Sequence, residues 1–175
     1  RNRIINKNED FLLSVPILNK DIKQLICEVK INNKIDWKKK HLKSIENNYS
    51  KTKFYKEYII FFQKLYEKNW IYLAELNEYF LKYMLNELEI KTEIISDRDC
   101  NFKKKKNNFL IEMCNYFNAD KYISNKGSEK YIDLDLFKKN NINHYFVNYK
   151  GVDYRNKNNT SIINLSIIDM LFYCG

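Results

Sequence analysis

A histidine, a hydroxyl and an amide share one predicted helical surface with a tryptophan in the stretch DWKKKHLKSIENNY, which begins at Asp36. The Asp36 carboxylate can accept the free N–H groups of a first turn, so we predict a helix that starts near Trp37. At the helical period, His41 and Asn48 fall inside the apolar arc near Trp37, with Ser44 at its border. This arrangement is typical of a pocket wall, and it is equally typical of a core whose histidine is hydrogen-bonded.

A second polar group, Asp169, interrupts the apolar segment NLSIIDMLFYCG. This segment predicts a buried helix, with Gly175 where a C-cap glycine belongs. A buried carboxylate costs several kcal/mol unless it is paired or hydrogen-bonded, so Asp169 requires a cationic partner or a polar cavity. The candidate partners are His41, Arg1 and Arg3. A structural ion pair is one outcome, and a carboxylate-oriented imidazole suited to general base catalysis is the other.

The elements that would position these groups change along the chain. Residues 3–6 and 11–17 flank a polar turn and predict a β-hairpin, and residues 22–31 form a third candidate strand. Two amphipathic helices with aromatic stripes follow at residues 54–65 and 73–88. The stripes favour a hydrophobic core over a base-stacking platform, because a platform would need exposed rings.

From Thr92 onward, candidate strands (92–95, 122–124 and 144–149) alternate with candidate helices (108–118 and 133–140). This order implies crossover units on a parallel sheet, whose strand ends are the expected ligand positions. After the second of these strands, SNKGSEKY offers the hydroxyls of Ser124 and Ser128 and backbone N–H groups to an anion, with an ordinary turn as the alternative. We therefore predict an α/β fold with an N-terminal β-hairpin region, a helical middle and alternating strand–helix units on a mostly parallel sheet. We expect a single domain over residues 1–175.

The composition bounds the class of protein. Hydrophobic residues make up 45% and aromatic residues 15% of the 175 positions, which is typical of a globular chain. The net charge of +9 raises nucleic acid as a partner, but the lysines are spread along the chain apart from residues 38–40 and 103–106. The four cysteines form no C-x-x-C pair and the chain has no membrane-length apolar run, so we expect free thiols in the cytoplasm and predict no metal site. The chain opens on Arg1 without an initiator Met, so we expect an N-terminal piece to be absent.

The chain resembles the WbqC-like protein family in a series of short segments that occur in the same order. They are RNRI at 1–4, KKHL at 39–42 with Trp37, Ile45 and Tyr49, ADKYIS at 119–124, LSIID at 165–169 and CG at 174–175. KKHL and LSIID are the most specific. Two features depart from the family pattern: its opening strand with Gln-Pro and Tyr-Pro is absent, and NKGS at 125–128 replaces a glycine-rich turn.

The resemblance implies a bacterial protein of O-antigen or other surface polysaccharide synthesis, and a transferase that attaches an acyl or aminoacyl group to a sugar. It identifies no cofactor. The expected partners are a small activated donor and a sugar acceptor, and nucleic acid is not favoured. We expect His41 to act as general base, oriented by Asp169. We expect the substrate to be bound by Arg1, Asn2, Arg3, Trp37, Ser44, Tyr49, Ser124 and Ser128. The alternative is a basic nucleic-acid-binding module without enzymatic activity, whose binding would weaken steeply with salt.

Overall fold

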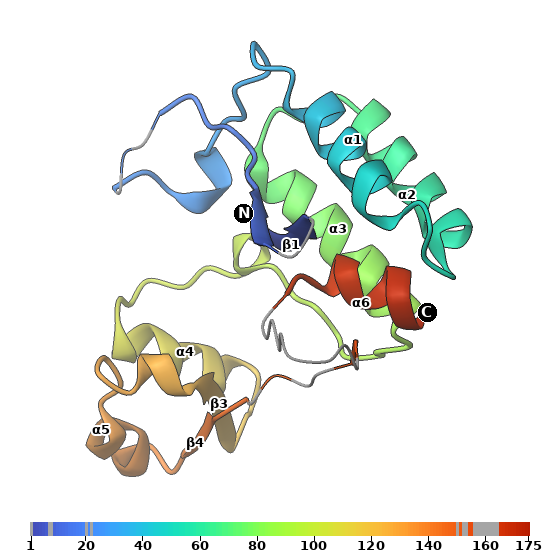
Figure 1. The fold of residues 1–175 in the computed structure, drawn as a ribbon. Coiled ribbons are helices and arrows are strands. Elements are labelled where there is room, and N and C mark those ends of the chain that lie inside the picture. Colours follow the sequence, from blue (N-terminus) through green and yellow to red (C-terminus); the bar gives the residue numbers. More distant parts are fainter. Residues whose placement is uncertain are drawn as a thin grey trace. The chain divides into compact units, whose positions relative to one another are not determined.

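The computed structural model describes residues 2–6, 9–19, 21, 23–149, 151, 154–155 and 165–175 (Figure 1). The chain divides into two compact units, Arg1–Lys91 with Gly151–Gly175 (unit 1) and Thr92–Lys150 (unit 2). Each unit has its own cluster of buried apolar side chains. The expectation of one domain over all 175 residues stays a prediction.

Unit 1 begins with the predicted hairpin, in which β1 (Asn2–Asn6) pairs antiparallel with β2 (Glu9–Leu13). The third candidate strand, over residues 22–31, is wrong. The described part of that stretch holds a 3₁₀ turn at Ile26–Glu28 and two isolated bridges, Ile17 with Ile31 and Lys30 with Tyr72. The apolar residues there do not alternate cleanly, so no single face is available for a strand to bury.

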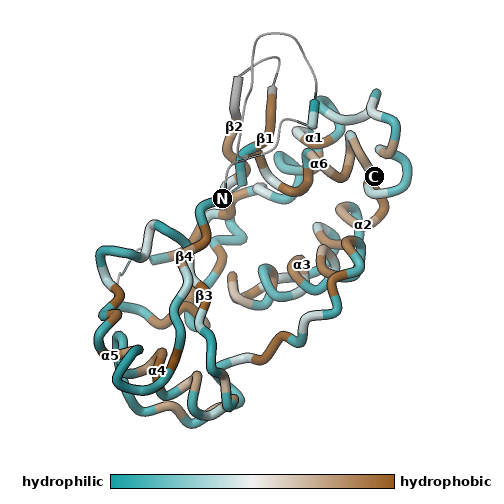
Figure 2. Tube along the Cα trace, turned by 90° about the horizontal axis from the view of Figure 1, so that it is seen from below, coloured by the Kyte–Doolittle hydropathy of each residue, from teal (hydrophilic) through white to brown (hydrophobic). Residues whose placement is uncertain are grey.

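The helical middle is confirmed by α1 (Trp37–Tyr49), α2 (Tyr55–Glu67) and α3 (Leu73–Glu87). Hydrophobic residues recur along α2 and α3 (Figure 2). The predicted aromatic stripes belong to the core: Tyr58, Phe61, Phe62 and Leu65 of α2 are buried, as are Leu76 and Met84 of α3. Asp36 precedes α1 as expected, although its side chain makes no capping hydrogen bond.

The predicted last helix is α6 (Ile167–Cys174), which packs into the same core. Its first turn is capped by the Ser166 hydroxyl, and the Ser166 N–H donates to the carbonyl of Arg3 at 2.8 Å, which joins α6 to β1. Gly175 closes the helix with φ +93°, and a Cβ there would lie 2.8 Å from the Phe54 ring. A glycine therefore fits this C-cap for both conformational and steric reasons.

Unit 2 consists of α4 (Asn107–Tyr116), β3 (Lys121–Asn125), α5 (Leu134–Lys139) and β4 (Asn143–Val147). β3 and β4 are parallel and α5 provides the crossover, as predicted. The strand expected at residues 92–95 is wrong, because these residues pair with no strand among the described residues. The mixed α/β class is confirmed, whereas a mostly parallel sheet is wrong: the described strands form one antiparallel and one parallel pair.

We expect Phe62→Ala to lower the free energy of unfolding by about 3–5 kcal/mol, because its ring is fully buried and neighbours those of Phe80 and Phe172. Urea denaturation followed by circular dichroism measures the loss. Ile60→Ala is the control on the same helix, since Ile60 is half exposed and its truncation should cost far less. An equal loss for the two variants would contradict the assigned core.

Candidate functional site

A fully buried carboxylate, Asp169 in the first turn of α6, accepts four hydrogen bonds from three side chains. The Tyr49 hydroxyl donates to Oδ2 at 2.7 Å and the Tyr154 hydroxyl donates to Oδ1 at 2.6 Å. Arg155 donates from Nε to Oδ1 at 2.8 Å and from Nη2 to Oδ2. Each carboxylate oxygen thus accepts two hydrogen bonds, which offset the cost of burying the charge.

The Asp169 carboxylate affects the pKa of the two tyrosine hydroxyls that donate to it. Burial and the Asp169 charge raise the pKa of the Tyr49 hydroxyl, and burial together with its hydrogen bond to Asp169 raises that of Tyr154. Both hydroxyls therefore stay protonated as donors. The Arg155 guanidinium also lies 4.0 Å from the centre of the Tyr173 ring, and this cation–π contact helps to hold Arg155 beside Asp169.

The expected need of Asp169 for a cation is met, but by Arg155 rather than by the candidates the sequence suggested. The structure does not form the expected His41–Asp169 pair. Arg3 contributes its backbone carbonyl to the cap of α6, and Arg1 lies outside the described residues. Arg155 belongs to a polar stretch without helical or strand periodicity, so no sequence pattern placed it near α6.

His41 lies on the buried side of α1 with 6% of its surface exposed. Its Nε2 is 3.1 Å from the carbonyl oxygen of Ser14, and its Nδ1 is 3.4 Å from the Tyr66 hydroxyl. A carbonyl can only accept, so the proton of the neutral ring is on Nε2, and Nδ1 carries the lone pair toward Tyr66. Burial lowers the pKa of His41, against the opposing effect of the Ser14 carbonyl, which leaves the ring neutral at pH 7.

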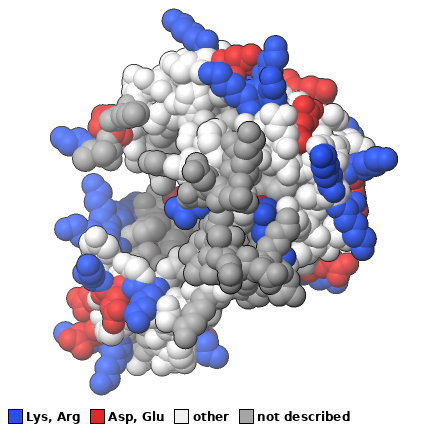
Figure 3. Space-filling model, viewed as in Figure 1, with Lys and Arg blue, Asp and Glu red and all other residues white. Residues whose placement is uncertain are grey.

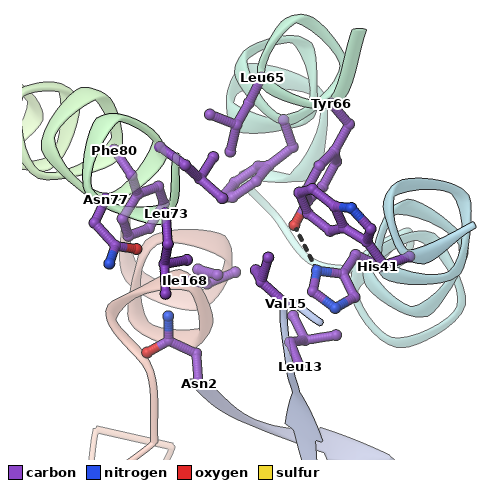
Figure 4. Close-up of a pocket in the computed structure, with 13 residues that line it drawn as sticks. Asn2, Leu13, Val15, His41, Leu65, Tyr66, Leu73, Asn77, Phe80 and Ile168 are labelled. Atoms are coloured by element: carbon purple, nitrogen blue, oxygen red, sulfur yellow. Dashed lines mark hydrogen bonds between the residues drawn. The ribbon is translucent and has the colours of Figure 1, made fainter. Parts of the chain in front are cut away.

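A cavity of about 120 Å³ adjoins this pair (Figure 4). Its walls are mostly apolar side chains of β2, α2, α3 and α6, with His41 and Tyr66 on one side. The amides of Asn2 and Asn77 complete the polar lining, and both residues are exposed, so they mark the side that meets solvent. The result is a small, mostly apolar cavity whose polar groups are an imidazole, a phenol, an indole and two amides.

A second cavity, of about 230 Å³, borders His41 and Trp37 as well. Its lining includes Ser44 and Lys40 of α1 and Phe11 of β2. The Ser44 hydroxyl donates to the carbonyl of Lys40 at 2.8 Å, so its hydrogen is used within the helix. His41 and Trp37, whose ring centroids are 5.3 Å apart, thus line both cavities.

In unit 2 the two predicted serines do meet. The hydroxyls of Ser124 and Ser128 are 2.8 Å apart, and Ser124 Oγ is 3.1 Å from Nε2 of His144 on the neighbouring strand. Both serines line a cavity of about 670 Å³. His144 was not predicted as a site residue, although its place opposite Tyr122 in a parallel pair is a signal that strand register could have given.

The substrate-binding residues expected from the sequence therefore lie in different surroundings. Asn2 and Trp37 line the cavity with His41, Ser44 lines the second cavity, and Tyr49 is bonded to Asp169. Arg3 lines neither cavity. The sequence missed Tyr66 and Asn77, because a tyrosine in an aromatic stripe and an exposed helical asparagine carry no distinguishing pattern.

Metal-ligating clusters and membrane-spanning helices are both absent from the described part of the chain. No group of three or more His, Cys, Asp and Glu side chains there could hold a metal ion. No helix there combines the length and the apolar composition that crossing a bilayer requires.

These observations define an α/β protein with a neutral buried histidine at the wall of a small cavity. The chain belongs to the WbqC-like protein family, whose model matches residues 1–175. It is also similar to an uncharacterised protein of Mycobacterium tuberculosis, Rv1507c, with 28% identity over 178 residues that cover all of this chain and 77% of that protein. No solved structure matches.

We expect Asp169→Asn to lower the free energy of unfolding by about 3–5 kcal/mol, because it leaves the Arg155 charge with an amide in place of its carboxylate. Tyr49→Phe is the graded comparison. It keeps the ring stacked on Phe172 at 4.8 Å and removes one hydrogen bond, which should cost about 1–3 kcal/mol. Chemical denaturation measures both. A loss for Asp169→Asn below that of Tyr49→Phe would contradict the central role of the ion pair.

The lowered pKa of His41 makes the protein's stability depend on pH. The unfolded chain, with a histidine pKa near 6.5, binds the proton more readily than the folded chain. The free energy of unfolding should therefore fall as the pH drops through and below the unfolded value near 6.5. His41→Gln should make this decline shallower. Part of the decline that remains should come from His144, because burial lowers its pKa as well. Denaturation curves at several pH values check the slope, and an unchanged slope in the variant would contradict the assignment.

Proposed function

We propose that this protein transfers a small acyl or aminoacyl group from an activated donor to a sugar in the cytoplasmic part of bacterial surface polysaccharide synthesis. The family resemblance supports the biological setting. The observation that carries the chemistry is His41: one ring nitrogen is anchored to a backbone carbonyl, and the other is open to Tyr66 at the cavity. The same geometry suits a proton acceptor of defined orientation.

In this proposal the Ser14 carbonyl does what a carboxylate does in other histidine bases. It accepts a hydrogen bond from Nε2–H, fixes the tautomer and favours the imidazolium that forms when Nδ1 takes up a proton. The contact between Nδ1 and the Tyr66 hydroxyl is long at 3.4 Å. Little binding energy is therefore lost when the hydroxyl or amine of the acceptor substrate replaces Tyr66 at Nδ1. Asp169 supports the site through the helix that carries His41 instead of touching its ring.

The transfer step follows from these positions. Nδ1 of His41 takes the proton of the acceptor's hydroxyl or amine as that oxygen or nitrogen bonds to the acyl carbon. The bond from the acyl carbon to the donor's leaving atom breaks, and the leaving group departs with the electron pair. The imidazolium then returns its proton to the leaving group, which restores the neutral ring. An activated donor of the ester, thioester or mixed-anhydride class meets this balance.

The size of the cavity limits what it can hold. Pockets that bury drug-sized ligands measure roughly 300–1,000 Å³, whereas this chamber has about 120 Å³. It therefore suits the small acyl part of a donor better than a whole activated sugar. The exposed amides of Asn2 and Asn77 are placed to hold a carbonyl or an amino group at its opening. The guanidinium groups of Arg1 and Arg3 remain the predicted contacts for an anionic donor group.

The charge on the face seen in Figure 3 does not favour the nucleic-acid alternative. On the face seen in Figure 3, basic and acidic side chains are interspersed on the described surface of both units. The aromatic stripes that would have to stack with bases are in the core of unit 1. Phosphate-dominated binding needs a continuous basic track, which that face does not present.

The test replaces His41 by Gln in the full-length protein. The glutamine amide can still donate to the Ser14 carbonyl, but it has no basic nitrogen, so turnover should fall by about 10²–10⁴ with little change in the melting temperature. Transfer from acyl and aminoacyl donors to sugar acceptors, followed by mass spectrometry, gives the readout.

Two comparisons make this result specific. Tyr66→Phe keeps the ring and removes the hydroxyl, so it should leave most of the turnover if Tyr66 only occupies Nδ1 in the resting state. Lys40→Gln alters a residue of the second cavity and does not touch Nδ1. Full turnover in His41→Gln would reject the proposed base.

A further inference from the structure

Unit 2 holds a cavity of its own at the end of β3, apart from the histidine site of unit 1. It measures about 670 Å³, which is within the range of small-molecule sites. Ser124 near the carboxyl end of β3 and Ser128 in the following 3₁₀ turn form one part of the wall, and Lys106 and Asn107 at the start of α4 form another. Crossover units in parallel sheets bind ligands at this end of their strands.

The hydrogens of the two serines can be assigned from their partners. The Ser128 hydroxyl is 2.7 Å from the carbonyl of Asn125, which can only accept, so Ser128 donates there. The 2.8 Å contact between the hydroxyls then takes the hydrogen of Ser124. Ser124 Oγ must in turn accept from Nε2 of His144, at 3.1 Å. Each group in this chain donates to the next.

His144 agrees with that direction. With the proton on Nε2, its Nδ1 is a bare lone pair, and this atom is buried without a hydrogen-bond partner among the described residues. The opposite tautomer would leave a buried N–H unsatisfied there, which proteins avoid more strictly than an unused acceptor. Burial also lowers the pKa of His144, which keeps the ring neutral.

Two consequences follow for a ligand. Both serine hydroxyls have used their single hydrogens, so they offer the cavity lone pairs and require donors, such as hydroxyl groups. The other walls include the aromatic residues Phe109, Tyr122 and Tyr131 and the basic residue Lys106. These walls match a molecule that carries hydroxyl donors, a planar ring and an anionic group.

We propose that this cavity binds a nucleotide. The ribose hydroxyls donate to Ser124 and Ser128, the base lies against the aromatic wall, and the phosphate meets Lys106 beside the first turn of α4, where the positive end of the helix dipole adds to the attraction. Unit 2 would then recognise the nucleotide part of a ligand independently of the His41 chemistry, so this proposal stands or falls apart from the proposed transferase.

Isothermal titration calorimetry on the full chain tests it, with adenosine, guanosine and uridine monophosphates as probes. At least one should bind at submillimolar concentration, and its nucleoside should bind about tenfold more weakly because it lacks the charge. Lys106→Gln should weaken the nucleotide by about tenfold. The Ser124→Ala, Ser128→Ala double variant should remove the preference for ribose over deoxyribose nucleotides.

Lys103→Gln is the matched control, because Lys103 belongs to the same lysine run and does not line the cavity. It should leave the affinity unchanged. Equal weakening by Lys103→Gln and Lys106→Gln would mean diffuse attraction to the lysine run and would overturn the proposal. Inorganic phosphate binding as tightly as the nucleotide, or no heat with any nucleotide at millimolar concentration, would overturn it too.

Discussion

The arrangement of unit 1 depends on one constraint, the burial of the Asp169 charge. A carboxylate with no exposed surface persists only if every oxygen is bonded, and the four donors come from Tyr49, Tyr154 and Arg155. Tyr49 ends α1 and Asp169 begins α6, 120 positions further along the chain. The Asp169 carboxylate thus fixes where the two helices meet. Any packing that displaces one of its donors is destabilised, because it leaves the buried charge incompletely hydrogen-bonded.

This constraint reaches the histidine through the geometry of α1. The buried residues of that helix, Trp37, His41, Ile45 and Tyr49, are spaced by four, so they form one ridge along the helix. A ridge that is anchored at Tyr49 and packed at Ile45 leaves His41 little freedom to rotate. Asp169 therefore affects His41 indirectly, by holding the helix that carries it through Tyr49, rather than by the direct contact that the sequence led us to expect.

The sequence predicted what local patterns can encode. The α1 ridge, the aromatic core of α2 and α3, the β3–α5–β4 crossover and the need of Asp169 for a cation all follow from periodicity or from the cost of burying a charge. The partners do not follow. Arg155 comes from a stretch without a period, and the acceptor that fixes the His41 tautomer is a backbone carbonyl, which every residue possesses. The strand expected at residues 92–95 failed for a related reason, because strand propensity supplies no partner strand.

The two histidines show how the same physical effects act on a ring in different surroundings. Burial lowers the pKa of both rings. In each ring Nε2 donates a hydrogen bond at 3.1 Å, from His41 to the carbonyl of Ser14 and from His144 to the hydroxyl of Ser124. They differ in the second nitrogen. In His144 it is buried, the ring lies beside those of Tyr122, Phe137 and Phe146, and no donor of the described residues reaches this nitrogen, so that ring serves to direct the serine hydroxyls. In His41 it faces a phenol at a distance beyond the usual range of a strong hydrogen bond, beside a chamber that has room for a small group. A histidine kept only for packing would gain from a closer partner at that nitrogen. The long contact agrees with the base that we propose, because a hydroxyl or amine of the acceptor can replace the Tyr66 hydroxyl at Nδ1 at little cost.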